Sequence, residues 1–503
     1  MSSSLDEEVA MMNVLSEKLL ISEIVQPDEE HVFLDEDVQT TSWSKGERQP
    51  VKFRDSSFAI VFLAQVTVIV VVGMAWGLPA LKNKGDDVPS TRTPHFAGAL
   101  WIIFWSFLTS IILSGVALLL MARFAENMLK FSVLYSIFSS LVLVVISLIQ
   151  GYSGAAISAS CTLLVACAYA WSVWNRLPFA TANLVTALSA IQMNWGLLLI
   201  PYTFCIVTCG YSLLWILGLI GVYKHSNLKC DENGVCDSSF NKGIFILFLL
   251  AFFWTQQVIK NVIHVTVAGV VGSWWFVPEE SNSGCSKSVT DSLTRSMTSS
   301  LGSICMGSLL VSVVQVVHHL VTQAKGNGRR NDIVYCIAEC LLNQLNKLIK
   351  YFNKWSYVYI GLYGYSYMEA GTKVMTLFKS RGWDAIINDQ LVLRVLSLVS
   401  FVIGTITGLI SVFIVQSHPS IISVFDDGDV VWVSFFCGLL MGTVVAGILM
   451  SVVASAVDTV VVLYAESPLD LHANYPFLSQ QMVEAWSATY PQEYRLVASS
   501  TLV

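Results

Sequence analysis

Long apolar runs without a charged residue recur along this chain, and they constrain its fold more than any other feature. Residues 57–81 and 97–121 are two such runs, and each is as long as the roughly 20 residues that a helix needs to cross bilayer hydrocarbon. With 54% hydrophobic and 13% charged residues among 503, the chain is too apolar for a soluble globular protein. We therefore expect an all-α, polytopic membrane protein.

Counting such runs predicts about ten transmembrane helices. The predicted spans are residues 57–81, 97–121, two within 131–175 that turn at Gly151–Gly154, 197–222 with a bend at Pro201, 245–276, 297–320, 355–367, 391–415 and 430–464. Two further stretches predict amphipathic interfacial helices. Residues 180–194 carry several amide side chains, and residues 340–355 have a basic face opposite an apolar one. For the first of these stretches, two complete spans within 176–224 are the alternative.

The distribution of charge predicts the topology. Lys45, Arg48, Lys52 and Arg54 precede the first span, and the positive-inside bias places the N-terminus in the cytosol. An even number of spans places the C-terminus there too. We expect an acidic, disordered cytosolic tail over residues 1–54, a transmembrane domain over 55–465 and a cytosolic tail over 466–503. The basic loop 322–354 disagrees with this topology. Either segment 355–367 does not cross and an extra crossing elsewhere compensates, or the bias fails there.

Signatures of enzymes and metal sites do not occur in the sequence. There is no P-loop, nucleophile elbow, HExxH or dinucleotide fingerprint. We therefore predict neither an enzyme nor a cofactor, and no nucleic-acid partner. The eleven cysteines form no CxxC pair. Cys230 and Cys236 flank a polar turn between two spans, and a disulfide between them would place that loop outside the cytosol.

The stretch from Phe245 to Phe276 begins as a purely apolar helix and becomes polar along its length. Gln256, Gln257, Lys260, Asn261 and His264 would be costly against lipid, so we expect them to face other helices or a wet cavity. The alternative is that they lie in the headgroup region and anchor the end of the helix.

Aromatic side chains are frequent near these helices, and buried acids are few. A quaternary ammonium has no N–H to donate, so ring faces and a carboxylate are its main means of recognition. The candidate binding residues are Trp254, Gln257, Asn261, Trp274, Trp275, Tyr363, Tyr367 and Glu369, the last as the negative charge. An interfacial aromatic belt is the alternative for Trp274 and Trp275. For Asp458, pairing with a lysine or capping a helix is the favoured interpretation.

Small residues four apart predict close helix contacts in lipid. Gly404 and Gly408 form such a ridge, and Gly438, Gly442 and Ala446 form another. We expect the two helices that carry these ridges to pack closely.

Four stretches together make the sequence resemble the choline transporter-like family, in particular its short-loop fungal and plant branch. They are Asn261–Phe276 with Thr266-Val-Ala-Gly at its centre, Ser300–Leu310, Leu348–Tyr359 with Asn353 and Tyr357, and the last helix with Asp458 and Ala465-Glu466. The resemblance covers roughly residues 58–486. It implies a ten-helix carrier with both termini in the cytosol.

The resemblance also implies choline as the cargo, or ethanolamine or another organic cation. Transport of a different solute such as thiamine pyrophosphate and a non-transporting, membrane-organising role are the alternatives. The expected partners are the bilayer and a small organic cation, and the oligomeric state is not indicated. The expected location is the plasma membrane, with an endomembrane as the alternative.

Overall fold

The computed structural model describes residues 46–79, 93–151, 153–226, 242–281, 286–326, 332–382, 391–417 and 429–491. Within them all regular structure is helical. The long helices are α2 (Ser56–Val72), α4 (Thr93–Ile149), α5 (Ser153–Val173), α7 (Leu199–Ser226), α8 (Lys242–Phe276), α10 (Leu301–Gly326), α11 (Asp332–Tyr363), α13 (Leu391–Ser417) and α15 (Asp429–Glu466). The shorter ones are α6 (Leu177–Met193), α9 (Lys287–Met297), α12 (Tyr367–Arg381), α16 (Pro468–Asn474) and α17 (Pro476–Thr489).

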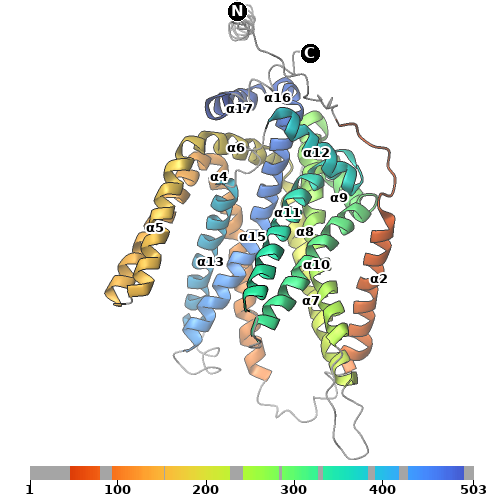
Figure 1. The fold of residues 1–503 in the computed structure, drawn as a ribbon, viewed down its shortest axis with the longest axis vertical. Helices are drawn as coiled ribbons and strands as arrows, with labels where there is room; N and C mark the ends of the chain where they lie inside the picture. The colour runs from red at the N-terminus through yellow and green to blue at the C-terminus, as the bar shows by residue number, and fades with distance from the viewer. Residues whose placement is uncertain are drawn as a thin grey trace, which may run out of the picture. The chain divides into compact units, whose positions relative to one another are not determined.

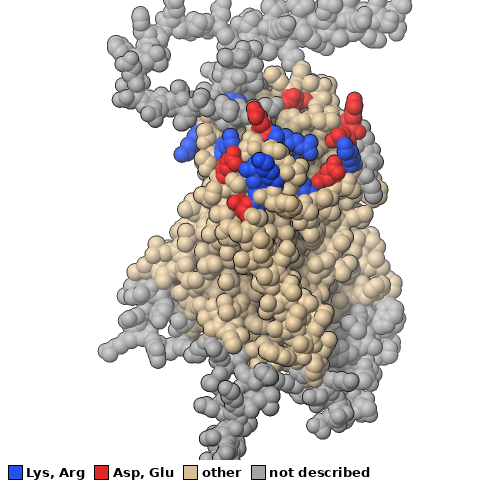
Figure 2. Space-filling model, turned by 90° about the vertical axis from the view of Figure 1, so that its right-hand side faces the viewer, with Lys and Arg blue, Asp and Glu red and all other residues tan. Residues whose placement is uncertain are grey.

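The described helices confirm an all-α polytopic membrane protein. Eight segments are long and apolar enough to cross a bilayer. Figure 2 shows the charged side chains of one face gathered near one end, above a broad uncharged surface. An uncharged surface of this kind suits contact with lipid. The predicted number of ten spans remains a prediction.

Helix α4 contains two of the predicted spans. Its backbone leaves helical geometry at Phe124, where φ is −132° and ψ is 34°, between the runs predicted to cross separately. A turn at Gly151, whose φ is +72°, follows α4, and α5 packs back against α4. Glycine adopts this left-handed conformation without steric cost. The turn therefore lies where the sequence predicts it.

Helix α6 occupies the stretch predicted as interfacial, and it runs across the neighbouring helices (Figure 1). Many of its side chains are buried, because it packs on α15, α17 and α4. The chain changes direction after α6 at Asn194, which has φ −117° and ψ 52°. Pro201 lies in the first turn of α7, where a missing N–H breaks no intrahelical bond. The chain therefore turns at Asn194, before the predicted span begins, and the bend at Pro201 remains a prediction.

Helix α11 replaces two predicted elements, the surface helix over 340–355 and the weak span over 355–367. Asp332–Tyr363 is one helix, and it packs against α8, α10 and α15. No helix-breaking residue lies between the two stretches, so nothing divides them. The basic face of the amphipathic stretch includes Lys354, which points into the bundle and pairs with α15.

Helices α13 and α15 confirm the predicted glycine ridges. A Cβ atom on Gly442 would lie 2.8 Å from the Cα atom of Gly404, and one on Gly438 would lie 2.9 Å from the Cα atom of Gly408. The two ridges therefore face each other, and the backbones approach closely because the facing glycines carry no side chains. Helix α15 also packs on α4, α6 and α8, so the contact with α13 is one of several that position it.

A leading segment, Gly46–Asp55, runs along one end of the bundle before α2 begins. Its backbone donates hydrogen bonds to Glu466 (2.6 Å, from Gly46) and to the Tyr363 carbonyl (2.8 Å, from Gln49). The Asp55 carboxylate accepts a bond from the Ser303 hydroxyl (2.6 Å) and one from the Tyr367 backbone N–H (3.1 Å). The segment thus connects α10, the start of α12 and the end of α15.

Replacing Asp55 with Ala should destabilise the protein by about 1–2 kcal/mol, the usual effect of losing a helix-terminal acceptor. Asp55 has φ +50°, and Ala tolerates this conformation less well than Asp or Asn. The melting temperature of the purified protein measures the change. Asp55→Asn keeps an acceptor oxygen and tolerates this backbone, so it should lose clearly less. Equal losses in the two variants would contradict the role of the acceptor.

Several predictions concern residues outside the described ranges. These are the acidic tail before residue 46 and the Cys230–Cys236 disulfide. The proposed boundaries of the tails also remain predictions. After Glu466, α16 packs on α8, and α17 packs on α6.

Candidate functional site

A charged pair lies inside the bundle between α11 and α15. Lys354 Nζ is 2.7 Å from Asp458 Oδ1, and the two side chains are 24% and 13% exposed. The same ammonium lies 4.3 Å from the ring centroid of Trp355. The pairing with lysine proposed for Asp458 is confirmed. We call Lys354, Trp355 and Asp458 the ion-pair site.

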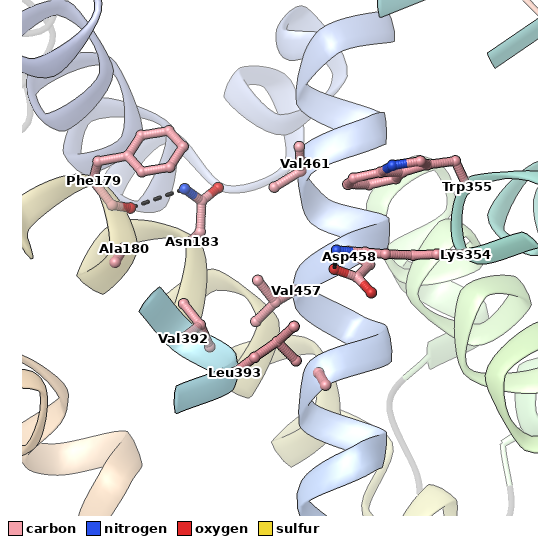
Figure 3. Close-up of a pocket in the computed structure, with 11 residues that line it drawn as sticks. Phe179, Ala180, Asn183, Lys354, Trp355, Val392, Leu393, Val457, Asp458 and Val461 are labelled. Carbon is pink, nitrogen blue, oxygen red and sulfur yellow. Dashed lines mark hydrogen bonds and ion pairs between the residues drawn. The ribbon is translucent and has the colours of Figure 1, made fainter. Parts of the chain in front are cut away.

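A cavity of about 40 Å³ adjoins the ion-pair site (Figure 3). Small-molecule sites usually measure about 300 Å³ or more, whereas a water needs only about 15 Å³. The cavity thus has room for water and is too small for an organic solute. Its lining residues come from α6, α11, α13 and α15 and are Phe179, Ala180, Asn183, Lys354, Trp355, Val392, Leu393, Ala454, Val457, Asp458 and Val461.

Two buried polar atoms at this cavity have no hydrogen-bond partner among the described residues. They are Asn183 Oδ1 and Trp355 Nε1, on side chains that are 1% and 2% exposed. The amide nitrogen of Asn183 donates to the Phe179 carbonyl at 2.8 Å. Buried polar atoms are nearly always paired with protein or water. An acceptor and a donor are therefore left for water or a ligand.

His264 of α8 links the ion-pair site to the rest of the core. Its Nδ1 atom is 2.6 Å from the Ser455 hydroxyl, and its Nε2 atom is 3.1 Å from the Lys354 carbonyl. A carbonyl oxygen can only accept a hydrogen bond, so the proton belongs on Nε2. In this tautomer Nδ1 can accept a hydrogen bond from the Ser455 hydroxyl. The imidazole thereby holds the backbone from which the Lys354 side chain extends.

A second polar cluster lies between α8, α10, α11 and the start of α12. We call it the tyrosine network, and its members are Asn261, Ser308, Asn353, Tyr357 and Tyr367. Asn261 Nδ2 donates to the hydroxyls of Ser308 (2.9 Å) and Tyr357 (3.3 Å). Asn353 accepts from the Tyr367 hydroxyl and donates to the Gly307 carbonyl at 2.8 Å. The rings of Tyr357 and His264 lie 6.2 Å apart, so the network adjoins the ion-pair site.

Substituting Tyr367 with Phe should lower stability by about 1–3 kcal/mol, because the buried Asn353 oxygen loses its donor. The Asn353 side chain is only 4% exposed, so water cannot easily replace that donor. Thermal melting of the solubilised protein tests this. Tyr135→Phe is the matched control, since the structure gives the Tyr135 hydroxyl no partner among the described residues. If both variants melt like the wild type, the network does not stabilise the core.

Four of the sequence-predicted residues lie on the α8 side of the core. Asn261 and Tyr367 belong to the tyrosine network. Trp254 donates from Nε1 to the Cys305 carbonyl at 3.0 Å, and Gln257 donates to Gln315 at 3.4 Å. These contacts place polar side chains of α8 against other helices, as the sequence predicts for this stretch. Lys260 is an exception, because the structure leaves it exposed.

The other predicted residues lie apart from that group. Trp274 stacks on Tyr475 with 4.3 Å between ring centroids, and Trp275 donates to the Ser467 carbonyl at 3.0 Å. Both rings are fully buried against the chain that follows α15. Tyr363 packs with Tyr359 and Tyr365 beside the leading segment. Glu369 lies in the first turn of α12, where a carboxylate stabilises the N-terminus of a helix.

Sequence reasoning missed Lys354, Trp355 and Asn183 as candidate site residues. Lys354 and Trp355 were assigned to a surface helix, and Asn183 was assigned to an interfacial one. A signal was present, because an adjacent lysine and tryptophan on a helix entering the membrane need a partner for the charge. The identity of that partner depends on how α11 packs against α15, which spacing alone does not give.

Two arginines outside the membrane-spanning helices hold carbonyl groups at the end of the bundle that carries the leading segment. Arg295 on α9 donates to the Gly361 carbonyl of α11. Burial, with a smaller contribution from the nearby Arg48, lowers the pKa of Arg295 to about 10. Arg381 on α12 donates to the Ala465 carbonyl at 3.1 Å, and burial lowers the pKa of Arg381 as well. Arg295 therefore remains charged at neutral pH.

Comparisons with known proteins agree with this architecture. The sequence profile of a family described as plasma-membrane choline transporter matches residues 157–469. Protein PNS1 of Neurospora crassa is 26% identical, over 87% of this chain and 81% of its own length. Protein PNS1 of Mycosarcoma maydis is 28% identical, over 89% and 85%. Protein PNS1 of Eremothecium gossypii is 28% identical, over 72% and 68%.

The described helices form the bundle of a polytopic membrane protein, with a charged pair and a polar network inside it. The family profile matches well over half of the chain. The chain belongs to the plasma-membrane choline transporter family.

Proposed function

We propose that this protein is a carrier that moves choline or a closely related organic cation across a membrane. The observation that carries the proposal is the ion-pair site, in which an ammonium group lies against both a carboxylate and an indole face. Ring faces attract cations through their quadrupole, and the attraction strengthens where water is excluded. A cargo with a positively charged head group could make the same two contacts.

Two of the sequence-based candidates fit this proposal directly. Asn261 and Tyr367 belong to the tyrosine network, which adjoins the ion-pair site. Trp254 and Gln257 lie on the same helix as Asn261. Tyr363, Trp274, Trp275 and Glu369 remain candidates from the sequence. In the proposal Asp458 supplies the negative charge.

The small cavity suits one conformation of a carrier. A cavity of about 40 Å³ cannot admit choline, so cargo requires a state in which the helices or side chains around it move apart. Alternating access provides such a state. We further propose the plasma membrane as the location and the cytosol as the compartment of both termini.

Uptake into vesicles containing the purified protein tests the proposal. Labelled choline should accumulate faster than in empty vesicles and should saturate. Unlabelled choline and ethanolamine should compete, while 3,3-dimethylbutan-1-ol, which replaces the trimethylammonium group with a neutral tert-butyl group, should not. Competition by thiamine pyrophosphate alone would favour the alternative cargo. No uptake of any of these solutes would favour a membrane-organising role.

Changing Trp355 to Phe should raise the choline concentration that gives half-maximal uptake about fivefold. This change corresponds to about 1 kcal/mol of cation–π attraction. Phe keeps a ring at this position but has a weaker quadrupole than indole. Concentration-dependent uptake measures the effect. Trp432→Phe is the matched control, because Trp432 lies on α15 and is 64% exposed on the outer surface. An equal change in both variants would remove Trp355 from the proposed site.

A further inference from the structure

Lys354 places its own ammonium group where the cargo's cation would bind. The Nζ atom is 2.7 Å from Asp458 Oδ1 and 4.3 Å from the Trp355 ring centroid. A carboxylate and a ring face are the two contacts through which proteins recognise organic cations. The subsite for a cation is therefore filled by a side chain of the chain itself.

The surroundings of this subsite contain unused hydrogen-bonding capacity. Asn183 Oδ1 and Trp355 Nε1 line the adjoining cavity without a partner among the described residues. Figure 3 shows Asn183 on one side of α15, with Lys354 and Trp355 on the other. Each of these atoms can pair with a water molecule or with a polar group of a ligand. A ligand that carries a cation and a polar group would therefore use hydrogen-bonding capacity that the described residues leave unpaired.

The backbone of Lys354 is held while its ammonium end has room to move. The Lys354 carbonyl lies 3.1 Å from His264 Nε2, which fixes the start of the side chain. The side chain itself is 24% exposed, so the pair is not sealed on all sides. The ammonium group of a lysine stands at the end of a flexible four-carbon chain. Withdrawal of the ammonium would enlarge the small cavity next to Asp458.

We propose that Lys354 is a tethered competitor, which occupies the cation subsite of the empty carrier and is displaced by the ammonium group of the cargo. This inference rests on the proposed function. It makes Lys354 a determinant of specificity, because only a cation can take over the charge of the displaced lysine beside Asp458. A neutral solute of the same shape would leave the carboxylate unpaired.

The proposal predicts whether each of two substitutions strengthens or weakens choline binding. When a binding-competent state is populated only fractionally, the apparent Kd is the intrinsic Kd divided by that fraction. Lys354→Met removes the competitor, so choline should bind about tenfold more tightly if the subsite is free for about a tenth of the time. Lys354→Arg should bind choline more weakly, because a guanidinium can hold a carboxylate through two hydrogen bonds.

Equilibrium binding of labelled choline to the purified full-length chain provides the test. Lys347→Met is the matched control, since Lys347 is an exposed residue of the same helix, and it should bind like the wild type. Lys354→Gln is a second neutral variant, whose amide can still donate to Asp458. Both neutral variants should bind more tightly than the wild type, and Lys354→Arg should bind less tightly.

Melting temperatures provide a readout that a purely structural lysine would not give. Lys354→Met leaves Asp458 without a counter-charge, so choline should raise the melting temperature of this variant more than that of the wild type. The double variant Lys354→Met, Asp458→Asn should gain nothing from choline. Neutral 3,3-dimethylbutan-1-ol should stabilise none of the variants.

The outcomes separate this inference from the proposed function. Choline binding by the wild type, with equal or weaker binding by Lys354→Met and Lys354→Gln and no extra thermal rescue, would overturn the tethered competitor alone. Lys354 would then serve to orient Asp458. No binding of any ammonium compound by the wild type and by Lys347→Met would overturn the proposed function, and the inference with it.

Discussion

Asp458→Asn should abolish uptake of choline-like cations and should also destabilise the protein. The cargo loses its counter-charge, and truncating one partner of a desolvated charge pair typically costs about 2–5 kcal/mol, or roughly 30-fold or more in affinity. The Lys354 ammonium also loses the partner that lies 2.7 Å away. Because the two side chains are 24% and 13% exposed, we expect a loss of stability of about 2 kcal/mol, below the range for fully buried pairs.

Initial uptake rates and melting temperatures of Asp458→Asn measure the two effects separately. The double variant Lys354→Met, Asp458→Asn removes both charges, so it should recover stability without recovering uptake. Glu369→Gln is a second comparison, because it removes the acid that the sequence favours as the counter-charge. Normal uptake by Asp458→Asn, with loss of uptake in Glu369→Gln, would make Glu369 of α12 the counter-charge of the cargo. That result would contradict the proposed site.

Gly442→Val should prevent α13 and α15 from packing in their present arrangement. Even the first carbon of a side chain on Gly442 would lie 2.8 Å from the Gly404 Cα atom and 2.8 Å from the Thr407 Cβ atom. A backbone atom cannot rotate away, so the helices must separate. We expect a loss of about 3 kcal/mol or more, at the upper end of the range for overpacking.

Size-exclusion chromatography and thermal melting of Gly442→Val provide the measurement. Gly447→Val is the matched control on the same helix, because a Cβ atom on Gly447 would meet no atom within 4 Å among the described residues. The control should melt close to the wild type. If both variants were equally stable, close approach of the two glycine ridges would not support the bundle.

Much of the membrane fold could be predicted from local sequence patterns. Charge-free runs predict most long helices, and the turn at Gly151 lies where the sequence places it. The ridges on α13 and α15 were also predictable, because small residues four apart have few uses in lipid other than close packing. Each of these features depends on residues that are near one another in the chain.

The path of α11 could not be predicted in the same way. Its first part has a basic face and its second part is apolar, so spacing alone separates it into a surface helix and a weak span. In the structure Asp332–Tyr363 is one continuous helix. Its Lys354 pairs with a carboxylate on a helix that lies about a hundred residues later in the chain. A charge can lie inside the bundle only where such a partner exists.

The candidate site was predictable in residue type and less so in location. Ring faces and polar side chains are present in the core, but Trp274 and Trp275 pack against the chain that follows α15. Their indole groups fit a binding cage and a packing contact equally well in sequence. Burial of both rings depends on α16, whose position is set by tertiary contacts.

A structure of the protein with bound choline tests the central claim most directly. We expect the trimethylammonium group between the Trp355 ring and the Asp458 carboxylate, with the Lys354 ammonium moved away from Asp458. We expect the choline hydroxyl near Asn183 or near water in the adjoining cavity. Choline bound elsewhere, with the Lys354–Asp458 contact intact, would contradict this account.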